Sequence, residues 1–176
     1  VGFVYGPMNY RIPGVVLWNK RIDKISESDK VHTNFIVRDS YGGNTKTISL
    51  DPIRSRIEYV NTIKDSDYFL CPKGDGNFSV RFYETLSLYR VPILIDTGAC
   101  LPFEDIIDYK KYIIRINLRD IYRIDEIIYD FHKNISPDEF MNIQNGCRSI
   151  FDQYLDIHVF FRNVLRKEFL DKVPEI

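Results

Sequence analysis

Short apolar segments alternate with amphipathic ones along most of this chain, and this alternation restricts its possible folds more than any other feature. Apolar segments typical of strands lie at residues 1–5, 34–37, 67–71, 91–95 and 112–116. Segments typical of helices occupy residues 15–25, 52–63, 79–89 and 120–134, and two further helices are predicted from Ser136 onward. Strands that alternate with helices are typical of a parallel sheet covered by helices. We therefore predict an α/β, Rossmann-like domain with a parallel sheet flanked by helices and a helical C-terminal tail.

The length and composition fit one domain. With 176 residues, of which 44% are hydrophobic and 28% charged, the chain can bury a core without disulfides. We expect a single domain over residues 1–176, with an α/β core at 1–135 and C-terminal helices at 136–176. The net charge of −1 gives no basic surface typical of nucleic-acid binding, so we expect no nucleic-acid partner. No apolar run approaches the length of a membrane-spanning helix, and we expect no membrane segment in this chain.

Three widely spaced cysteines without a CxxC pair argue against a disulfide framework. An odd number is compatible with a reducing compartment, and we expect the cytoplasm. A Golgi-lumenal protein with a membrane anchor outside this segment is the alternative. The first residue, Val1, already belongs to a predicted strand, so we expect the chain to be one domain of a longer protein.

The segment that begins at Asp51 has the clearest helix signals. Asp51 is a favoured N-cap residue, and Pro52 fits the first helical position. Apolar residues at helical spacing then predict the buried face of this helix: Ile53, Ile57, Val60 and Ile63.

The segment CPKGDGNFSVRFYETLSLYRVPILID, residues 71–96, predicts a strand end, a glycine-rich loop, a helix and a second strand. In a parallel sheet, ligands bind beyond the carboxyl ends of the strands, and this loop leaves such an end. Gly74 and Gly76 carry no Cβ and allow the backbone to approach a ligand closely. The helix that follows directs free N–H groups and the positive end of its dipole to the same place, which suits a phosphate or diphosphate.

Two charged side chains in this helix extend the prediction from a phosphate to a nucleotide. Arg81 lies about one turn into the helix and could hold a phosphate group with two hydrogen bonds. Glu84, three residues further, could accept hydrogen bonds from two sugar hydroxyls. The competing interpretation is a surface ion pair between Arg81 and Glu84, which contributes roughly a few tenths of a kcal/mol.

Three segments within residues 67–109 resemble the C-terminal half of exostosin-type glycosyltransferases: YFLCPKGDGNFSVRFYETLS, VPILID and LPFEDIIDY. The family pattern reads CPRGxGxxSxRFxEAL, IPVIL and LPFxxxIDW. The resemblance implies one half of a GT-B fold, in which two Rossmann-like domains face each other across a cleft. It also implies that this half binds a nucleotide-sugar donor, usually a UDP-sugar. Transfer to a glycan or other hydroxyl acceptor would invert the anomeric centre, as in polysaccharide biosynthesis.

The resemblance also assigns roles to single residues. Glu84 matches the glutamate expected at the nucleotide ribose, and Arg81 matches the arginine suited to the diphosphate. Arg81 would act in catalysis by stabilising the negative charge that grows on the leaving group. The family's donor loop is matched by Gly74, Asp75, Gly76, Asn77 and Ser79. Two arginines that follow predicted strands are further candidates for contact with donor or acceptor, namely Arg11 and Arg38.

Two alternatives stand beside this interpretation. The family's N-terminal acceptor domain, which usually supplies the general base, is absent from this chain, so the domain could be a non-catalytic nucleotide-sugar-binding module or partner subunit. A metal-dependent transferase could instead use Asp65 and Asp67 of the sequence DSD as ligands. We expect no metal site and no required cofactor, manganese and magnesium included.

The chain departs from the family pattern just before residues 91–95. The family often has glycine or another small residue there, whereas this chain has Leu88, Tyr89 and Arg90. We expect these bulky residues to change either the pocket or the end of the helix.

Overall fold

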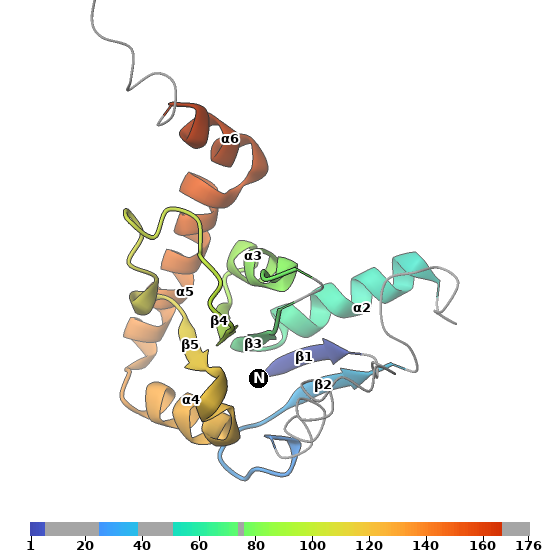
Figure 1. Ribbon diagram of the computed structural model, residues 1–176. Helices are drawn as coiled ribbons and strands as arrows, with labels where there is room; N and C mark the ends of the chain where they lie inside the picture. Colours follow the sequence, from blue (N-terminus) through green and yellow to red (C-terminus); the bar gives the residue numbers. More distant parts are fainter. Residues whose placement is uncertain (6–24, 39–50, 74–75, 167–176) are drawn as a thin grey trace, which may run out of the picture.

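The computed structural model describes residues 1–5, 25–38, 51–73 and 76–166 (Figure 1). In these ranges five strands form one sheet in the order β2-β1-β3-β4-β5, and every neighbouring pair is parallel. The strands are β1 (Gly2–Tyr5), β2 (Asn34–Val37), β3 (Tyr68–Cys71), β4 (Val91–Asp96) and β5 (Ile114–Asn117). The predicted fold class, a parallel sheet flanked by helices with further helices at the C-terminal end, is confirmed.

The helices also follow the sequence pattern closely. The α-helices are α2 (Pro52–Lys64), α3 (Val80–Ser87), α4 (Ile124–Lys133), α5 (Pro137–Ile150) and α6 (Ile157–Leu165). Shorter helical segments are η1 (Tyr109–Lys111), η2 (Leu118–Arg123) and the π-helical η3 (Phe151–Leu155). The helix predicted at residues 15–25 lies outside the described residues except at its last position.

Two adjacent residues of β3 show how the helices cover both faces of the sheet. The ring of Phe69 packs edge-on against Tyr59 of α2, whereas the ring of Tyr68 contacts Phe131 and His132 of α4. Because successive strand residues point to opposite faces, α2 and α4 must cover opposite sides of the sheet. Side-chain contacts between α2 and α3 place α3 beside α2, as Figure 1 also shows.

The strand order creates a switch point at the centre of the sheet. The chain leaves β1 toward β2 on one side and leaves β3 toward β4 on the other. The two connections therefore diverge at the carboxyl ends of β1 and β3, and such a switch point is the usual ligand position in open α/β sheets. The glycine-rich loop leaves β3 at this end of the sheet.

The predicted buried face of α2 is wrong in its first half. Asp51 does cap the helix, accepting a hydrogen bond from the Arg54 N–H at 3.1 Å. However, Ile53 and Ile57 are 70% and 55% exposed. The buried side is formed instead by Tyr59, Thr62 and Ile63. Tertiary packing decides which side of α2 is buried. The side that carries Tyr59 packs against Phe69 of the sheet and bonds to Glu84 of α3.

The bulky residues before β4 change the helix end. Tyr89 follows α3 with a φ of 60°, a left-handed conformation that favours glycine. The N–H groups of Tyr89 and Arg90 donate to the carbonyls of Leu86 and Thr85, at 3.2 and 3.1 Å. This pair of bonds closes the helix as a Schellman motif. Since the motif lies at the amino edge of the sheet, the departure from the family pattern does not touch the glycine-rich loop.

The C-terminal helices pack beside α3 and then extend beyond the sheet (Figure 1). The Arg148 guanidinium of α5 donates to the Ser87 carbonyl at the end of α3. Further along, the ring of Phe160 in α6 contacts Phe103, which lies in the segment after β4. In the part of the chain that the structure describes, no helix is both long and apolar enough to cross a membrane.

Candidate functional site

The start of α3 has an N-cap residue that does not cap the helix. Ser79 occupies the N-cap position, but its hydroxyl makes no hydrogen bond to the backbone of the first turn, which is the usual role of a serine there. The hydroxyl is buried and, within the described residues, has no hydrogen-bond partner. An unpaired buried hydroxyl is rare in native proteins and calls for a reason. Next to the free N–H groups of a helix start, it can donate to an anionic ligand oxygen.

Asn77 ties the glycine-rich loop to the segment after β4. Its side-chain amide donates to the Thr97 carbonyl at 3.4 Å, and the Thr97 hydroxyl donates to Asn77 Oδ1 at 2.5 Å. A Cβ added at Gly76 would lie 2.8 Å from the ring of Phe78, so this exposed ring would have to shift to admit a side chain there. Two loops at the carboxyl edge are thus joined directly beside the α3 start.

An ion-pair cluster supports the segment to which Asn77 is tied. Arg115 of β5 donates from Nε to Asp96 at 3.0 Å and from Nη1 to Glu104 at 2.9 Å. Its Nη2 also reaches the Ala99 carbonyl at 3.0 Å. The N–H of Gly98 donates to Asp96 at 2.8 Å, and this bond together with Arg115 lowers the pKa of the Asp96 carboxyl below its ordinary value.

Asp96→Asn is expected to remove stability in a pH-dependent way. Because the folded-state pKa of Asp96 is lowered, its contribution is present above the ordinary value of 3.8 and disappears as the pH falls through the folded pKa. Urea unfolding midpoints of wild type and variant should therefore differ at about pH 7, and the difference should shrink as the pH falls below 3.8. Asp108→Asn, at an exposed i,i+3 pair with Lys111, is the matched control and should behave like wild type. A difference in unfolding midpoint that stayed constant with pH would contradict the lowered pKa of Asp96.

Arg81 lies at the switch point of the sheet. Its Nη2 donates to the Val4 carbonyl of β1 at 3.5 Å, and its guanidinium lies 5.3 Å from the centre of the Phe3 ring. A guanidinium has five N–H donors, and this long bond occupies one of them. Arg81 therefore stands on α3 at the switch point between β1 and β3, and within the described residues its other donors make no hydrogen bond.

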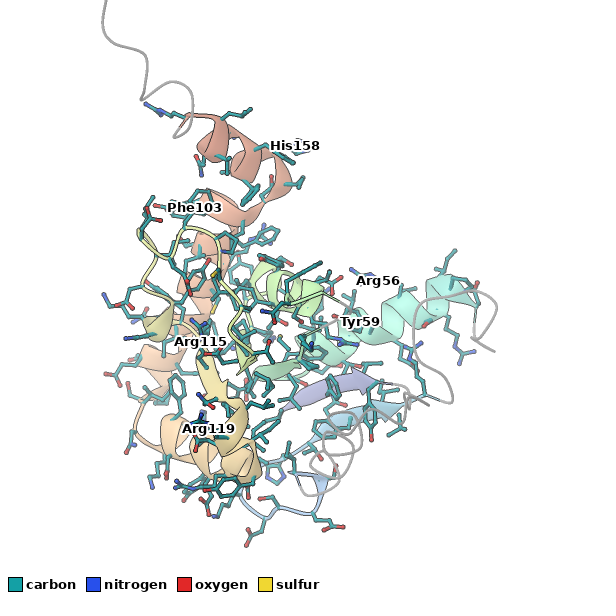
Figure 2. All side chains as sticks on the ribbon, viewed as in Figure 1. Arg56, Tyr59, Phe103, Arg115, Arg119 and His158 are labelled. Atoms are coloured by element: carbon teal, nitrogen blue, oxygen red, sulfur yellow. The ribbon has the colours of Figure 1, made fainter. Side chains whose placement is uncertain are left out.

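Glu84 is held by two donors from α2. Arg56 Nη1 donates to Glu84 Oε1 at 2.7 Å, and the Tyr59 hydroxyl donates to Oε2 at 2.6 Å. Figure 2 shows both donor side chains between α2 and α3. The side chains of Arg81 and Glu84 thus have different partners, so the competing interpretation of a surface ion pair between them does not describe this structure.

The remaining predicted residues have different outcomes. Arg38 lies just after β2 and donates to the Ser55 hydroxyl, to the Ser55 carbonyl at 3.0 Å and to Glu58 at 3.0 Å. It is therefore anchored to α2, and its contact with a substrate stays a prediction. Three predicted residues lie outside the described residues: Arg11, Gly74 and Asp75.

The alternative metal site at Asp65 and Asp67 has poor geometry for this loop. Asp65 caps the C-terminal end of α2, and Asp67 immediately precedes β3. Both lie at the amino edge of the sheet, opposite the edge from which the glycine-rich loop leaves. Across the described ranges, no group of three or more His, Cys, Asp and Glu residues could hold a metal ion. Independence from metals stays a prediction.

Sequence reasoning did not find three of the residues at this edge: Arg56, Tyr59 and Thr97. Arg56 and Tyr59 lie 28 and 25 residues before Glu84, and Thr97 lies 20 residues after Asn77. The helical register of α2 places residues 56 and 59 on one side, which is the only local signal of their proximity.

The comparisons with known proteins agree with this arrangement of loop and helix. Residues 18–131 match the family described as "Exostosin GT47 domain". The chain belongs to this exostosin family. The matched residues include β2 to β4, the described part of the glycine-rich loop and most of α4, so the exostosin resemblance of residues 67–109 is confirmed.

Individual relatives of this exostosin domain come from animals and plants. It is 32% identical over 112 residues to the "Exostosin-1 homolog" of Caenorhabditis elegans, which is 63% of this chain and 28% of the relative. Over 102 residues it is 30% identical to the "Probable glucuronoxylan glucuronosyltransferase" of Arabidopsis thaliana, 57% of this chain and 22% of the relative. Drosophila melanogaster "Exostosin-1" is 25% identical over 99 residues, 56% of this chain and 12% of the relative. The chain thus covers less than a third of the length of these curated relatives.

Proposed function

We propose that this exostosin domain is the donor-binding half of an inverting, GT-B-type glycosyltransferase and that it binds a UDP-sugar. The observation that carries the proposal is the position of Arg81 at the switch point between β1 and β3, directly beside the start of α3. Two independent features point to an anion at the same place, namely the N-terminal amides of α3 and the unpaired Ser79 hydroxyl. The names of the relatives, exostosins and glycosyltransferases, support the same class of reaction.

In the proposed complex the diphosphate lies over the α3 start. The N–H groups of the first turn and the Ser79 hydroxyl donate to its oxygens, and Arg81 forms charge-assisted bonds from the side of β1. Glu84, one turn further along α3, accepts hydrogen bonds from the ribose hydroxyls. Residues at the start of α3 and in its first two turns would thus contact both the diphosphate and the ribose of the donor.

The same groups also serve the transfer step. As the bond between the anomeric carbon and the diphosphate oxygen breaks, negative charge grows on the leaving diphosphate. The amides of α3 and Arg81 are already oriented toward that charge, so they stabilise it without a metal ion. An acceptor hydroxyl, deprotonated by a base outside this domain, attacks the anomeric carbon from the opposite side, which inverts its configuration.

Thermal unfolding in the presence of nucleotides tests the proposal. UDP at about a hundred times its Kd is expected to stabilise the protein by about 2.7 kcal/mol, a rise in Tm of about 5–10 °C. GDP, ADP and CMP are the matched controls and should shift the Tm less, each with and without manganese. Manganese dependence would favour the alternative at Asp65 and Asp67, and stabilisation by none of the nucleotides would contradict the proposal. Binding of UDP-sugar without transfer by the full-length protein would favour the non-catalytic alternative.

A further inference from the structure

The two α2 side chains that hold Glu84 differ in how firmly they are fixed. Tyr59 is partly buried, and its ring packs edge-on against Phe69, with the ring centres 5.8 Å apart. Phe69 is fully buried in β3, so the Tyr59 ring rests on the rigid centre of the sheet. Arg56, in contrast, has a side chain that is 58% exposed. To move aside, Arg56 must break its ion pair with Glu84 and the contact of its guanidinium with the Tyr59 ring, 5.2 Å from the ring centre. Both contacts are weak for an exposed arginine, whereas a packed tyrosine does not move without disturbing the core.

We infer that Tyr59 is a positioning residue that fixes the Glu84 carboxylate for a ribose diol, and that Arg56 is the exchangeable partner whose place a ribose hydroxyl takes. The inference rests on the proposed function, because it assumes that a nucleotide binds at this edge. It adds an α2 residue to a site so far attributed to the loop and α3.

The chemistry of a carboxylate supports this division of roles. An ionised carboxylate offers about four lone-pair sites on its two oxygens. Tyr59 uses one site on Oε2, and Arg56 uses one on Oε1. If Arg56 moves aside, Oε1 and the free site on Oε2 remain for two adjacent sugar hydroxyls, while the bond to Tyr59 prevents rotation of the carboxylate. A carboxylate that is held in place before binding loses less conformational entropy on binding than a free one. It should therefore distinguish a ribose diol from a sugar that lacks one of the two hydroxyls more strongly.

The state of the Tyr59 hydroxyl is compatible with this role. Burial raises the pKa of Tyr59 well above its ordinary value, and the hydrogen bond to Glu84 raises it further. The hydroxyl therefore stays protonated and remains a donor throughout the physiological pH range. Since Glu84 accepts this bond at 2.6 Å, removing the hydroxyl alone should release the carboxylate and leave the packed ring in place.

The test compares the affinities of UDP and 2′-deoxy-UDP, measured by calorimetry. Wild type is expected to bind UDP about tenfold or more tightly, because the deoxy compound lacks one hydroxyl that donates to Glu84. Tyr59→Phe should reduce this ratio to about threefold or less, whereas Arg56→Gln should keep it. Tyr83→Phe is the matched control, since Tyr83 is the half-buried neighbour of Glu84 in α3 and its ring packs against Phe82. It should keep the wild-type ratio.

A double-mutant cycle separates an action through Glu84 from a general structural effect. In a Glu84→Gln background, Tyr59→Phe should change the ratio by less than about twofold, because its target is already removed. A wild type that prefers UDP while Tyr59→Phe keeps the ratio would overturn the inference and leave the proposed function standing. A wild type that binds both compounds equally would overturn it as well, since Glu84 would not contact the 2′-hydroxyl. A wild type that binds neither compound would contradict the proposed function itself.

Discussion

Arg81→Ala is expected to lower the affinity for UDP by about a hundredfold or more. A charged hydrogen bond contributes about 1.5–3 kcal/mol, and a guanidinium on a diphosphate forms two in the usual geometry. Calorimetry on the folded variant measures the loss directly. The variant should remain folded, because the Arg81 side chain contacts the rest of the described fold through one long bond, 3.5 Å to Val4, and through the Phe3 ring.

A matched control for this change is Arg90→Ala. Arg90 is half-buried, lies at the amino edge of the sheet and donates to the Lys64 carbonyl at 3.1 and 2.6 Å. Its removal should affect stability only slightly and leave the UDP affinity unchanged. Equal affinities of wild type, Arg81→Ala and Glu84→Gln would mean that the nucleotide does not bind at α3.

Phe69→Ala is expected to cause the largest loss of stability. Phe69 is fully buried in the central strand β3 and contacts the rings of Phe3 and Tyr59. Replacing a buried phenylalanine by alanine removes its transfer free energy and leaves a cavity, at a cost of about 3–5 kcal/mol. Urea unfolding followed by circular dichroism measures the change. Because Tyr59 rests on this ring, the variant should also bind UDP less tightly wherever it remains folded.

The matched control for Phe69→Ala is Phe161→Ala in α6. Phe161 is 55% exposed and contacts the ring of Phe160, so the same chemical change should cost about 0.5 kcal/mol or less. Similar losses in the two variants would show that the core is not centred on β3. Such a result would also contradict the role proposed for Tyr59, which requires Phe69 to be a rigid part of the core.

The segment from β3 to β4 could be predicted almost completely because its signals are local. An apolar run, two glycines and a second apolar run fix a strand, a loop, a helix and a strand within residues 67–96. The same segment carries most of the exostosin pattern, and residues 18–131 match that family. The change expected from the bulky residues before β4 is found at the end of α3, where Tyr89 adopts the left-handed conformation in place of a glycine.

The partners of the site residues could not be predicted, because they depend on the strand order. Arg81 meets the Val4 carbonyl across 77 residues of sequence, and this contact exists only because β1 lies next to β3. Glu84 finds Arg56 and Tyr59 because α2 lies beside α3, an arrangement that no periodicity records.

The face of α2 illustrates the limit of sequence patterns most clearly. The spacing of apolar residues predicted that Ile53 and Ile57 would be buried, yet both are mostly exposed. The helix turns Tyr59 toward Phe69 and Glu84 instead, since this side satisfies the packing of a ring and the hydrogen bond of a carboxylate together. The sequence by itself determined the elements, their order and the family, because those follow from local propensity and spacing. The tertiary structure alone decided which side chains meet at the carboxyl edge, because such contacts are set by non-local packing.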